Sequence, residues 1–361
     1  TDVNGLYGAT FFWRHATDAG LRPLVGAEIR DGEFRAVALI ETETGYANLC
    51  RLLTHVHAGT FTPECTLGEL SRGLHLIAPD AATARRLLAC DLCPSGLWLG
   101  VDPATQTYPE LRRLARLSQD HGLPLVATAP AMQRDEADRR TARMLAAIRT
   151  GKTLERVEPA DLPHPKAMLR GPTQLARELA DWPEAIRNND RLVERCEGFA
   201  LLPRGPIFPD FPCHGSTPGA ELRRLCDEGL RWRYDGRAPP DADARLEREL
   251  KLIESRRLSG YFLVVWDIVR YARGRGVPVA GRGSGASSLV AYLLGITNVC
   301  PLAYDIPFER FLNEKREDFP DLDIDFCWRI RDDVIDYAFD RWGRDHAAMV
   351  CTHNAFQPRS A

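Results

Sequence analysis

Residues 319–326 read Phe319-Pro320-Asp321-Leu322-Asp323-Ile324-Asp325-Phe326, so carboxylates alternate with large apolar side chains. In a strand, successive side chains point to opposite faces, so the three acids would share one face while the apolar residues enter a core. Carboxylates two residues apart lie roughly 6.5–7 Å apart along the strand and repel each other unless a cation lies between them. The stretch therefore predicts a strand that binds a divalent metal ion.

Two other structures fit an alternation of acids. One is an edge strand whose solvated acids discourage aggregation, and the pattern alone leaves this interpretation open. The other is an EF-hand calcium loop running from Asp321 to Asp332. That loop needs glycine at its sixth position, which is Phe326 here, and glutamate at its twelfth, which is Asp332. The sequence therefore argues against a calcium loop.

A glycine-rich segment lies upstream of the acids. Residues 276–280 are expected to form a short strand, Gly281-Arg282-Gly283-Ser284-Gly285 a turn, and residues 286–294 a helix. Glycines let backbone amides approach an anion closely, and a helix N-terminus adds partial positive charge. The segment therefore predicts a binding site for phosphate groups.

The same segment matches the dinucleotide-binding pattern G-x-G-x-x-A. That fold would place a second buried strand, ending in an acid, about 20 residues further on, but residues 298–305 are interrupted by Pro301. A Walker loop is excluded because the G-K-[ST] ending is absent. A triphosphate site followed by a metal-binding strand is instead the layout of nucleotidyltransferases with a polymerase-beta-like palm, in which two metal ions assist the reaction.

Composition limits the class of protein. The 361 residues suffice for two domains, and 44% hydrophobic residues, 27% charged residues and a net charge of −3 indicate neither disorder nor a basic nucleic-acid coat. Cys90 and Cys93 form the only C-x-x-C, without the second pair of a structural zinc site. No membrane span or signal peptide is apparent, so we expect a cytoplasmic protein. The chain starts at Thr1 without methionine and ends at Ala361 soon after an amphipathic helix, so we expect both ends to be cuts in a longer protein.

Two regions differ in pattern. The first ~150 residues alternate short apolar runs with helical patterns, which favours an α/β fold with a parallel sheet or barrel. Four prolines between Leu202 and Cys213 indicate a domain boundary. Amphipathic helices are expected after it over residues 220–234 and 244–257. The strands are expected over residues 22–29, 35–40, 75–78, 96–101 and 123–128.

Residues 281–297, 308–313 and 320–326 closely resemble the palm of bacterial C-family replicative DNA polymerases. Segments within residues 1–9, 26–28 and 147–152 are similar to the polymerase and histidinol phosphatase (PHP) domain that precedes that palm, so the resemblance covers essentially the whole chain. It implies a PHP-like (β/α) barrel over residues 1–200, truncated at its N-terminus. The first part of a polymerase-beta-like α+β palm would follow over residues 201–361.

The resemblance implies an enzyme that adds deoxynucleotides to a primer 3′ end by two-metal catalysis. Asp323 and Asp325 correspond to the family's two adjacent catalytic aspartates, which bind two Mg²⁺ ions, while Asp321 is a bordering acid. Gly283 and Ser284 fall in the family's triphosphate-binding turn, and Arg282 stands beside them. The family's third catalytic aspartate would lie beyond residue 361, so we expect the chain alone to be inactive.

The PHP-like half departs from the family pattern. Members with an intact metal cluster have histidine after T-D, where this chain has Val3, and an N-D-V-H run where it has residues 129–132, Ala-Pro-Ala-Met. Asp2 and Glu28 match remaining ligand positions. The resemblance thus implies a degenerate site with no PHP metal cluster, which argues against the alternative of a PHP-type phosphoesterase.

Two short segments bear on the branch of the family. Residues 343–350 and 358–361 are more similar to error-prone, damage-induced polymerases than to the main replicase, which remains the alternative. The implied partners are primer-template DNA, deoxynucleoside triphosphates, a sliding clamp and mutagenesis accessory proteins. A non-catalytic scaffold module in a mutagenesis complex is an alternative of another class.

Overall fold

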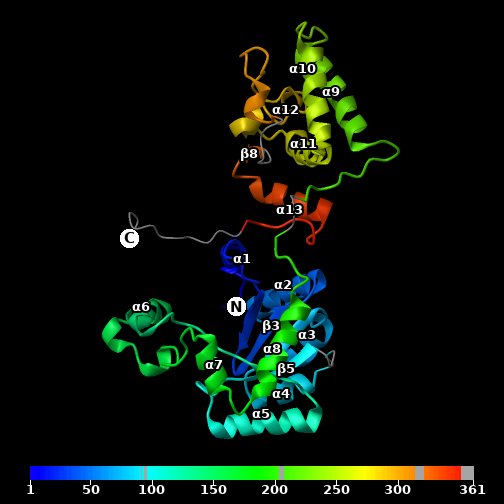
Figure 1. Ribbon diagram of the computed structural model, residues 1–361. Helices are drawn as coiled ribbons and strands as arrows, with labels where there is room; N and C mark the ends of the chain where they lie inside the picture. Colours follow the sequence, from blue (N-terminus) through cyan, green and yellow to red (C-terminus); the bar gives the residue numbers. More distant parts are fainter. Residues whose placement is uncertain (91, 93–95, 203–206, 314–320, 351–361) are drawn as a thin grey trace. The chain divides into compact units, whose positions relative to one another are not determined.

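The computed structural model describes residues 1–90, 92, 96–202, 207–313 and 321–350. The chain divides into two compact units, a first unit of Thr1–Pro203 and a second unit of Arg204–Ala361 (Figure 1). Parts of four predicted features lie outside the described residues: Cys93, two prolines of the predicted domain boundary (Pro203 and Pro206), the start of the acidic stretch at Phe319 and Pro320, and the branch-specific segment 358–361.

The first unit is built on one six-stranded sheet with strands in the order β1-β2-β3-β4-β5-β6. Pairing is antiparallel from β2 through β3 to β4 and parallel elsewhere. The α/β class is thereby confirmed, with a strand at each of the five predicted places, whereas closure into a barrel stays a prediction. The strands are β1 (Asp2–Val3), β2 (Gly26–Asp31), β3 (Phe34–Ile40), β4 (Leu74–Ala78), β5 (Leu97–Val101) and β6 (Leu125–Ala127).

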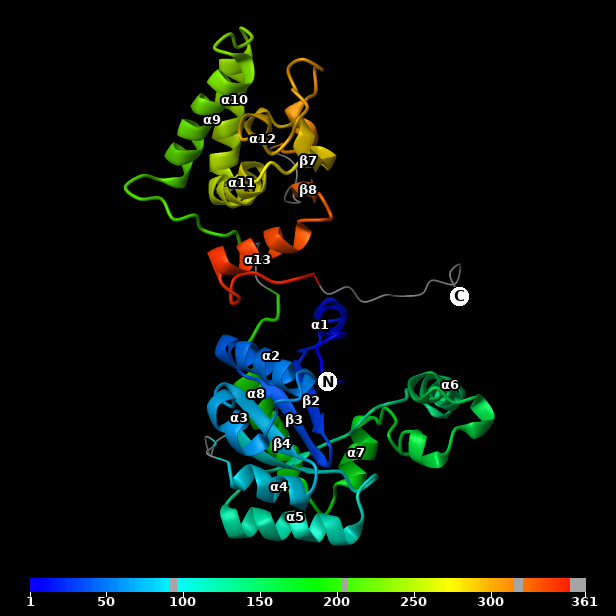
Figure 2. The ribbon, with the colours of Figure 1, turned by 180° about the vertical axis from the view of Figure 1, so that it is seen from behind.

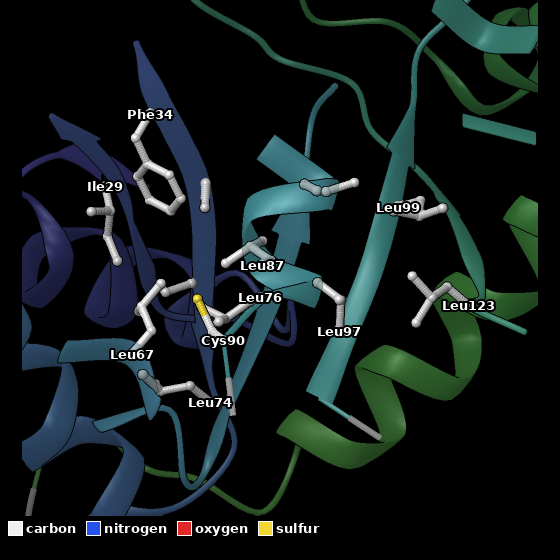
Figure 3. Close-up of a cluster of buried hydrophobic side chains, with 14 of the residues drawn as sticks. Ile29, Phe34, Leu67, Leu74, Leu76, Leu87, Cys90, Leu97, Leu99 and Leu123 are labelled. Atoms are coloured by element: carbon white, nitrogen blue, oxygen red, sulfur yellow. The ribbon is translucent and has the colours of Figure 1, made fainter. Parts of the chain in front are cut away.

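Helices cover both faces of this sheet. On β4, Leu76 belongs to the core that Figure 3 shows, whereas its neighbour Ile77 packs with Leu192 of α8 on the other side. Alternate residues of the strand therefore enter two different cores, as the pleat of a strand requires. The helices are α1 (Ala9–Asp18), α2 (Glu43–His57), α3 (Pro63–Leu70), α4 (Ala81–Leu88), α5 (Tyr108–His121), α6 (Arg139–Thr150), α7 (Pro172–Glu178) and α8 (Pro183–Cys196).

The second unit consists of helices and a short two-stranded ribbon of β7 and β8, which Figure 2 shows at one side of α11 and α12. Helix α9 approaches α12 so closely at Gly229 that an added Cβ would lie 2.4 Å from the carbonyl oxygen of Leu293, so glycine is required there. The elements are α9 (Pro218–Tyr234), α10 (Ala242–Ser255), α11 (Ser259–Gly274), β7 (Val279–Arg282), α12 (Leu289–Leu293), β8 (Asp323–Phe326) and α13 (Arg331–Trp342).

Two predicted boundaries around the glycine-rich turn are wrong. The strand begins at Val279 rather than Gly276, because the Val277 N–H donates to the carbonyl of Ala272 and Gly276 turns the chain with a φ of +73°. The helix expected over 286–294 is shorter, because residues 283–287 form a 3₁₀ turn and Ser288 caps the five-residue α12. Among the described residues no helix is both long enough and apolar enough to span a membrane.

Candidate metal and nucleotide site

The ribbon fixes the direction of the acidic side chains. Strands β7 and β8 pair antiparallel, with Arg282 opposite Asp323 and Ala280 opposite Asp325. Because side chains alternate, both aspartates share the face of Arg282, while Ile324 packs against the core of the second unit. Two of the three acids predicted for this face, Asp323 and Asp325, therefore share it, and the strand is shorter than predicted because it begins at Asp323. Asp321 precedes this strand and is exposed.

Arg282 bridges the two carboxylates. Its Nη1 lies 3.3 Å from Oδ2 of Asp323, and its Nε lies 3.2 Å from Asp325. The hydrogen bond to Asp325, followed by the charges of Asp325 and Asp323, raises the pKa of Arg282. All three side chains reach the solvent, with Asp323 the least exposed at 45%, so water and ions have access to them. The two carboxylates thus converge on a single cation.

The two converging carboxylates can be compared with the ligands that Mg²⁺ prefers. Magnesium binds through carboxylate oxygens and retains several water ligands, so two convergent, exposed carboxylates are a suitable donor set. The described residues contain no group of three or more His, Cys, Asp or Glu side chains arranged to hold a metal ion. Asp323 and Asp325 therefore offer oxygen donors of the kind that Mg²⁺ prefers, and water or another oxygen donor would be needed to complete its coordination.

The glycine turn lies directly against the acids. Gly283 has a φ of +71°, and a Cβ added to it would lie 3.3 Å from Oδ2 of Asp323. A Cβ added to Gly285 would lie 2.6 Å from Leu322, the residue before β8. Ser284, between these glycines, is partly exposed. The structure therefore brings the predicted phosphate-binding turn to the predicted metal-binding strand.

The short helix after the turn does not contribute as predicted. The N–H groups of Leu289 and Val290 donate to the carboxylate of Glu249 at 3.0 and 3.2 Å, so an internal anion already occupies the start of α12. Burial raises the pKa of Glu249, and the hydrogen bond from Arg245 opposes that rise. The positive end of this helix is therefore already paired with an acid, which leaves the predicted phosphate site to the glycine turn itself.

Tyr261 is a further residue at this site that the sequence analysis did not find. Its hydroxyl oxygen accepts a 2.9 Å hydrogen bond from the N–H of Leu322. Burial raises the pKa of Tyr261, and the charges of Asp321 and Asp323 add to the rise. In the sequence it is an ordinary aromatic residue of an apolar helix, so no local pattern marks it.

The two acids singled out in the first unit have internal partners. Glu28 on β2 is buried and accepts hydrogen bonds from Arg30 Nε, at 2.6 Å, and Arg35 Nε. Asp2 Oδ2 accepts a 2.6 Å hydrogen bond from the Gly8 N–H. Strand pairing places Val3 opposite Glu28. A buried carboxylate between two guanidinium groups has its charge balanced by the protein itself.

Comparison with known proteins covers both units. The family model for the bacterial DNA polymerase III alpha NTPase domain matches residues 220–361, which include the ribbon and the glycine turn. An error-prone DNA polymerase of Symbiobacterium thermophilum is 35% identical over 100% of this chain and 37% of its own length. The DNA polymerase III subunit alpha of Borreliella burgdorferi is 31% identical over 100% of this chain and 35% of its length. That of Escherichia coli is 33% identical over 98% of this chain and 34% of its length.

The chain thus spans about a third to two fifths of the length of these relatives. The alignments cover both units, and the overall identity is 31–35% whichever of the two names the relative carries. The chain belongs to the bacterial DNA polymerase III alpha subunit family, which includes the error-prone polymerases.

Proposed function

We propose that the protein is a DNA-directed DNA polymerase that adds deoxynucleotides to the 3′ end of a primer. The observation that supports this most strongly is the convergence of Asp323 and Asp325 on one cation beside Gly283. Metal ligands and a phosphate-binding turn have to be adjacent in nucleotidyl transfer, because the metal ions contact the triphosphate.

In this proposal Asp323 and Asp325 hold Mg²⁺. The chemistry that bound Mg²⁺ supplies at such a site is activation of the attacking hydroxyl and neutralisation of the pyrophosphate charge. Gly283 and Ser284 bind the triphosphate through the backbone and the hydroxyl group, and the absence of a Cβ at Gly283 keeps the approach to Asp323 open. Arg282, already between the acids, would reach a phosphate from the same face.

The two units have different roles in the proposal. The second unit is the first part of a polymerase-beta-like palm, and the first unit is a PHP-like domain without a metal cluster. The two arginines that pair with Glu28 support the assignment of a PHP-like domain without a metal cluster, because they supply the positive charge that metal ions would otherwise bring. We assign the protein to the cytoplasm, acting on primer-template DNA and deoxynucleoside triphosphates, with a sliding clamp and accessory proteins as partners.

We further assign the protein to the error-prone branch on the basis of the sequences of residues 343–350 and 358–361. The relatives carry both names at similar identity, 35% for an error-prone polymerase and 33% for a replicative alpha subunit. A fidelity assay on an undamaged and a lesion-containing template distinguishes the branches: the error-prone enzyme is expected to extend past the lesion, and a replicase to stop.

One observation favours the non-catalytic alternative: Arg282 already forms ion pairs with both acids. Primer extension by the full-length protein, with a templated primer and Mg²⁺, decides between the two. Asp323→Ala is expected to reduce extension by at least about 10³-fold, because a metal ligand is lost. The matched control is Asp321→Ala, which removes a neighbouring acid before the strand and is expected to retain activity. Unchanged extension in Asp323→Ala would favour the scaffold.

A further inference from the structure

Helix α10 contributes a buried ion pair beside the glycine turn. Glu249 is fully buried, and Arg245, one turn earlier, donates from Nε to Glu249 Oε1 at 2.6 Å. The same Oε1 accepts the Leu289 N–H, while Oε2 accepts the Ser288 hydroxyl at 2.9 Å and the Val290 N–H. Each carboxylate oxygen therefore has two donors, three of the four from residues 288–290.

Arg245 binds the same part of the chain by donating to a backbone carbonyl group. Its Nη2 donates to the carbonyl oxygens of Ser287 and Ile306, both at 3.0 Å, and its guanidinium group lies over the ring of Phe308. Glu249 thus accepts hydrogen bonds from residues 288–290 and Arg245 donates one to Ser287, so the pair fixes residues 287–290. Ser288 N–H in turn donates to the carbonyl of Gly285, which connects the fixed segment to the turn.

Stability alone does not account for this pair. Placing two charges in a protein interior costs desolvation energy, and well-packed apolar residues often serve as well or better. What an apolar pair cannot do is define the position of a particular backbone segment through directional hydrogen bonds. Here Gly285 and Ala286 separate the segment from Ser284, and Gly283 itself is exposed.

We propose that Glu249 and Arg245 are positioning residues, which hold the Gly283–Ser284 turn where it receives the triphosphate of the incoming nucleotide. The inference rests on the proposed polymerase function. Neither side chain touches the nucleotide: Glu249 is fully buried, and Arg245 is occupied by Glu249 and two carbonyls. They determine the positions of the backbone amides of the turn and of the Ser284 hydroxyl group.

The test is steady-state primer extension by the full-length protein at varied deoxynucleotide concentration. Glu249→Gln keeps the shape of the side chain but turns an amide NH₂ toward groups that are themselves donors. Losing hydrogen bonds to a charged group is expected to raise KM for the nucleotide about tenfold, with kcat within about threefold. Arg245→Lys keeps the charge but not the fork that reaches Ser287 and Ile306, and is expected to raise KM less.

Asp267→Asn is the matched control. Asp267 is also a buried carboxylate of the second unit, with donors from Arg270, Tyr337 and Arg341, but it joins α11 to α13 and has no contact with the turn. Both variants are expected to lower the melting temperature, and only Glu249→Gln to change KM. A KM in Glu249→Gln no higher than in Asp267→Asn overturns the proposal.

A milder variant covers the case in which Glu249→Gln does not fold. Ser288→Ala removes one of the four donors and is expected to raise KM about twofold to threefold; an unchanged KM there also overturns the proposal. Failure of the polymerase assignment looks different, because either the unmodified protein then fails to extend a primer or Asp323→Ala extends it normally. If Asp323→Ala loses activity as expected but Glu249→Gln has an unchanged KM, the positioning role is refuted and the polymerase proposal stands.

Discussion

Strand acids meet arginines in both units, on β2 and on β8, but the two arrangements differ. In the first unit Glu28 is buried, with a side chain 5% exposed, and receives two guanidinium groups. In the second unit Asp323 and Asp325 are 45% and 60% exposed and share the single guanidinium group of Arg282. A buried, doubly paired carboxylate belongs to the fold, whereas an exposed pair that shares one exposed cation can exchange that cation for another.

The energetic difference follows from burial. Removing the partner of a buried charge leaves that charge uncompensated in the protein interior, which costs about 3–5 kcal/mol of stability. Exposed ion pairs contribute little to stability. The acid on β2 should therefore affect stability and the acids on β8 should affect function.

The largest expected effect on stability is at Glu28. Glu28→Gln weakens two charge-assisted hydrogen bonds from Arg30 and Arg35, and the free energy of unfolding of the first unit is expected to fall by about 2–3 kcal/mol. Denaturant unfolding followed by circular dichroism measures it. The control Glu33→Gln changes an exposed acid in the turn between β2 and β3 and should have no effect. Equal stability of the two variants would contradict a structural role for the acid on β2.

At Gly283 the expected effect is on activity. Gly283→Ala places a Cβ 3.3 Å from Asp323 Oδ2 on a residue with a φ of +71°, which disfavours any residue with a side chain. Primer extension by the full-length protein is expected to fall about fivefold, since about 1 kcal/mol of strain falls on the turn itself. Gly274→Ala, where an added Cβ meets nothing within 4 Å, is the matched control. Equal activity of the two variants would contradict the placement of the turn.

A smaller effect is expected from His75 of the first unit. The Trp98 Nε1–H donates to its Nδ1 at 3.0 Å, and its Nε2 faces Glu41. Burial, followed by the charge of Arg195, lowers the pKa of His75 from its ordinary value of 6.5, while Glu41 opposes the shift. The unfolded chain therefore binds more protons as the pH falls below 6.5, and the first unit loses stability there. Unfolding at pH 5.5 and 7.5 should show this loss, and His75→Gln should reduce it.

The smallest expected effect on stability is at Arg282. Because its ion pairs with Asp323 and Asp325 are exposed, Arg282→Gln is expected to leave the unfolding midpoint of the second unit unchanged. A clear loss of stability, comparable to that of Glu28→Gln, would mean that the β8 pair is structural as well.

The parts of the site that the sequence predicted are local patterns. The alternation of Asp323, Ile324 and Asp325 places the acids on one face, and the glycines around Ser284 mark the turn, because each depends only on neighbouring residues. The start of α12 is also marked locally, since Ser288 before two apolar residues is a normal N-cap.

The supporting contacts could not be predicted in this way. Glu249 binds residues about 40 positions later in the chain, and an acid four residues after Arg245 is ordinary on a solvated helix face. Only tertiary packing shows that this face is buried. The same holds for Tyr261, whose hydroxyl group meets Leu322 61 residues away.

Divalent metal binding is the most direct test of the central claim, that the β8 acids are metal ligands and not merely the solvated acids of an edge strand. We would titrate Mn²⁺, as a probe for Mg²⁺, into the chain and follow the free ion by electron paramagnetic resonance. The double variant Asp323→Asn/Asp325→Asn is expected to bind Mn²⁺ at least about tenfold more weakly, and Asp321→Asn to bind it within about twofold of the unmodified chain. Binding by the double variant that equals the unmodified chain would contradict the account.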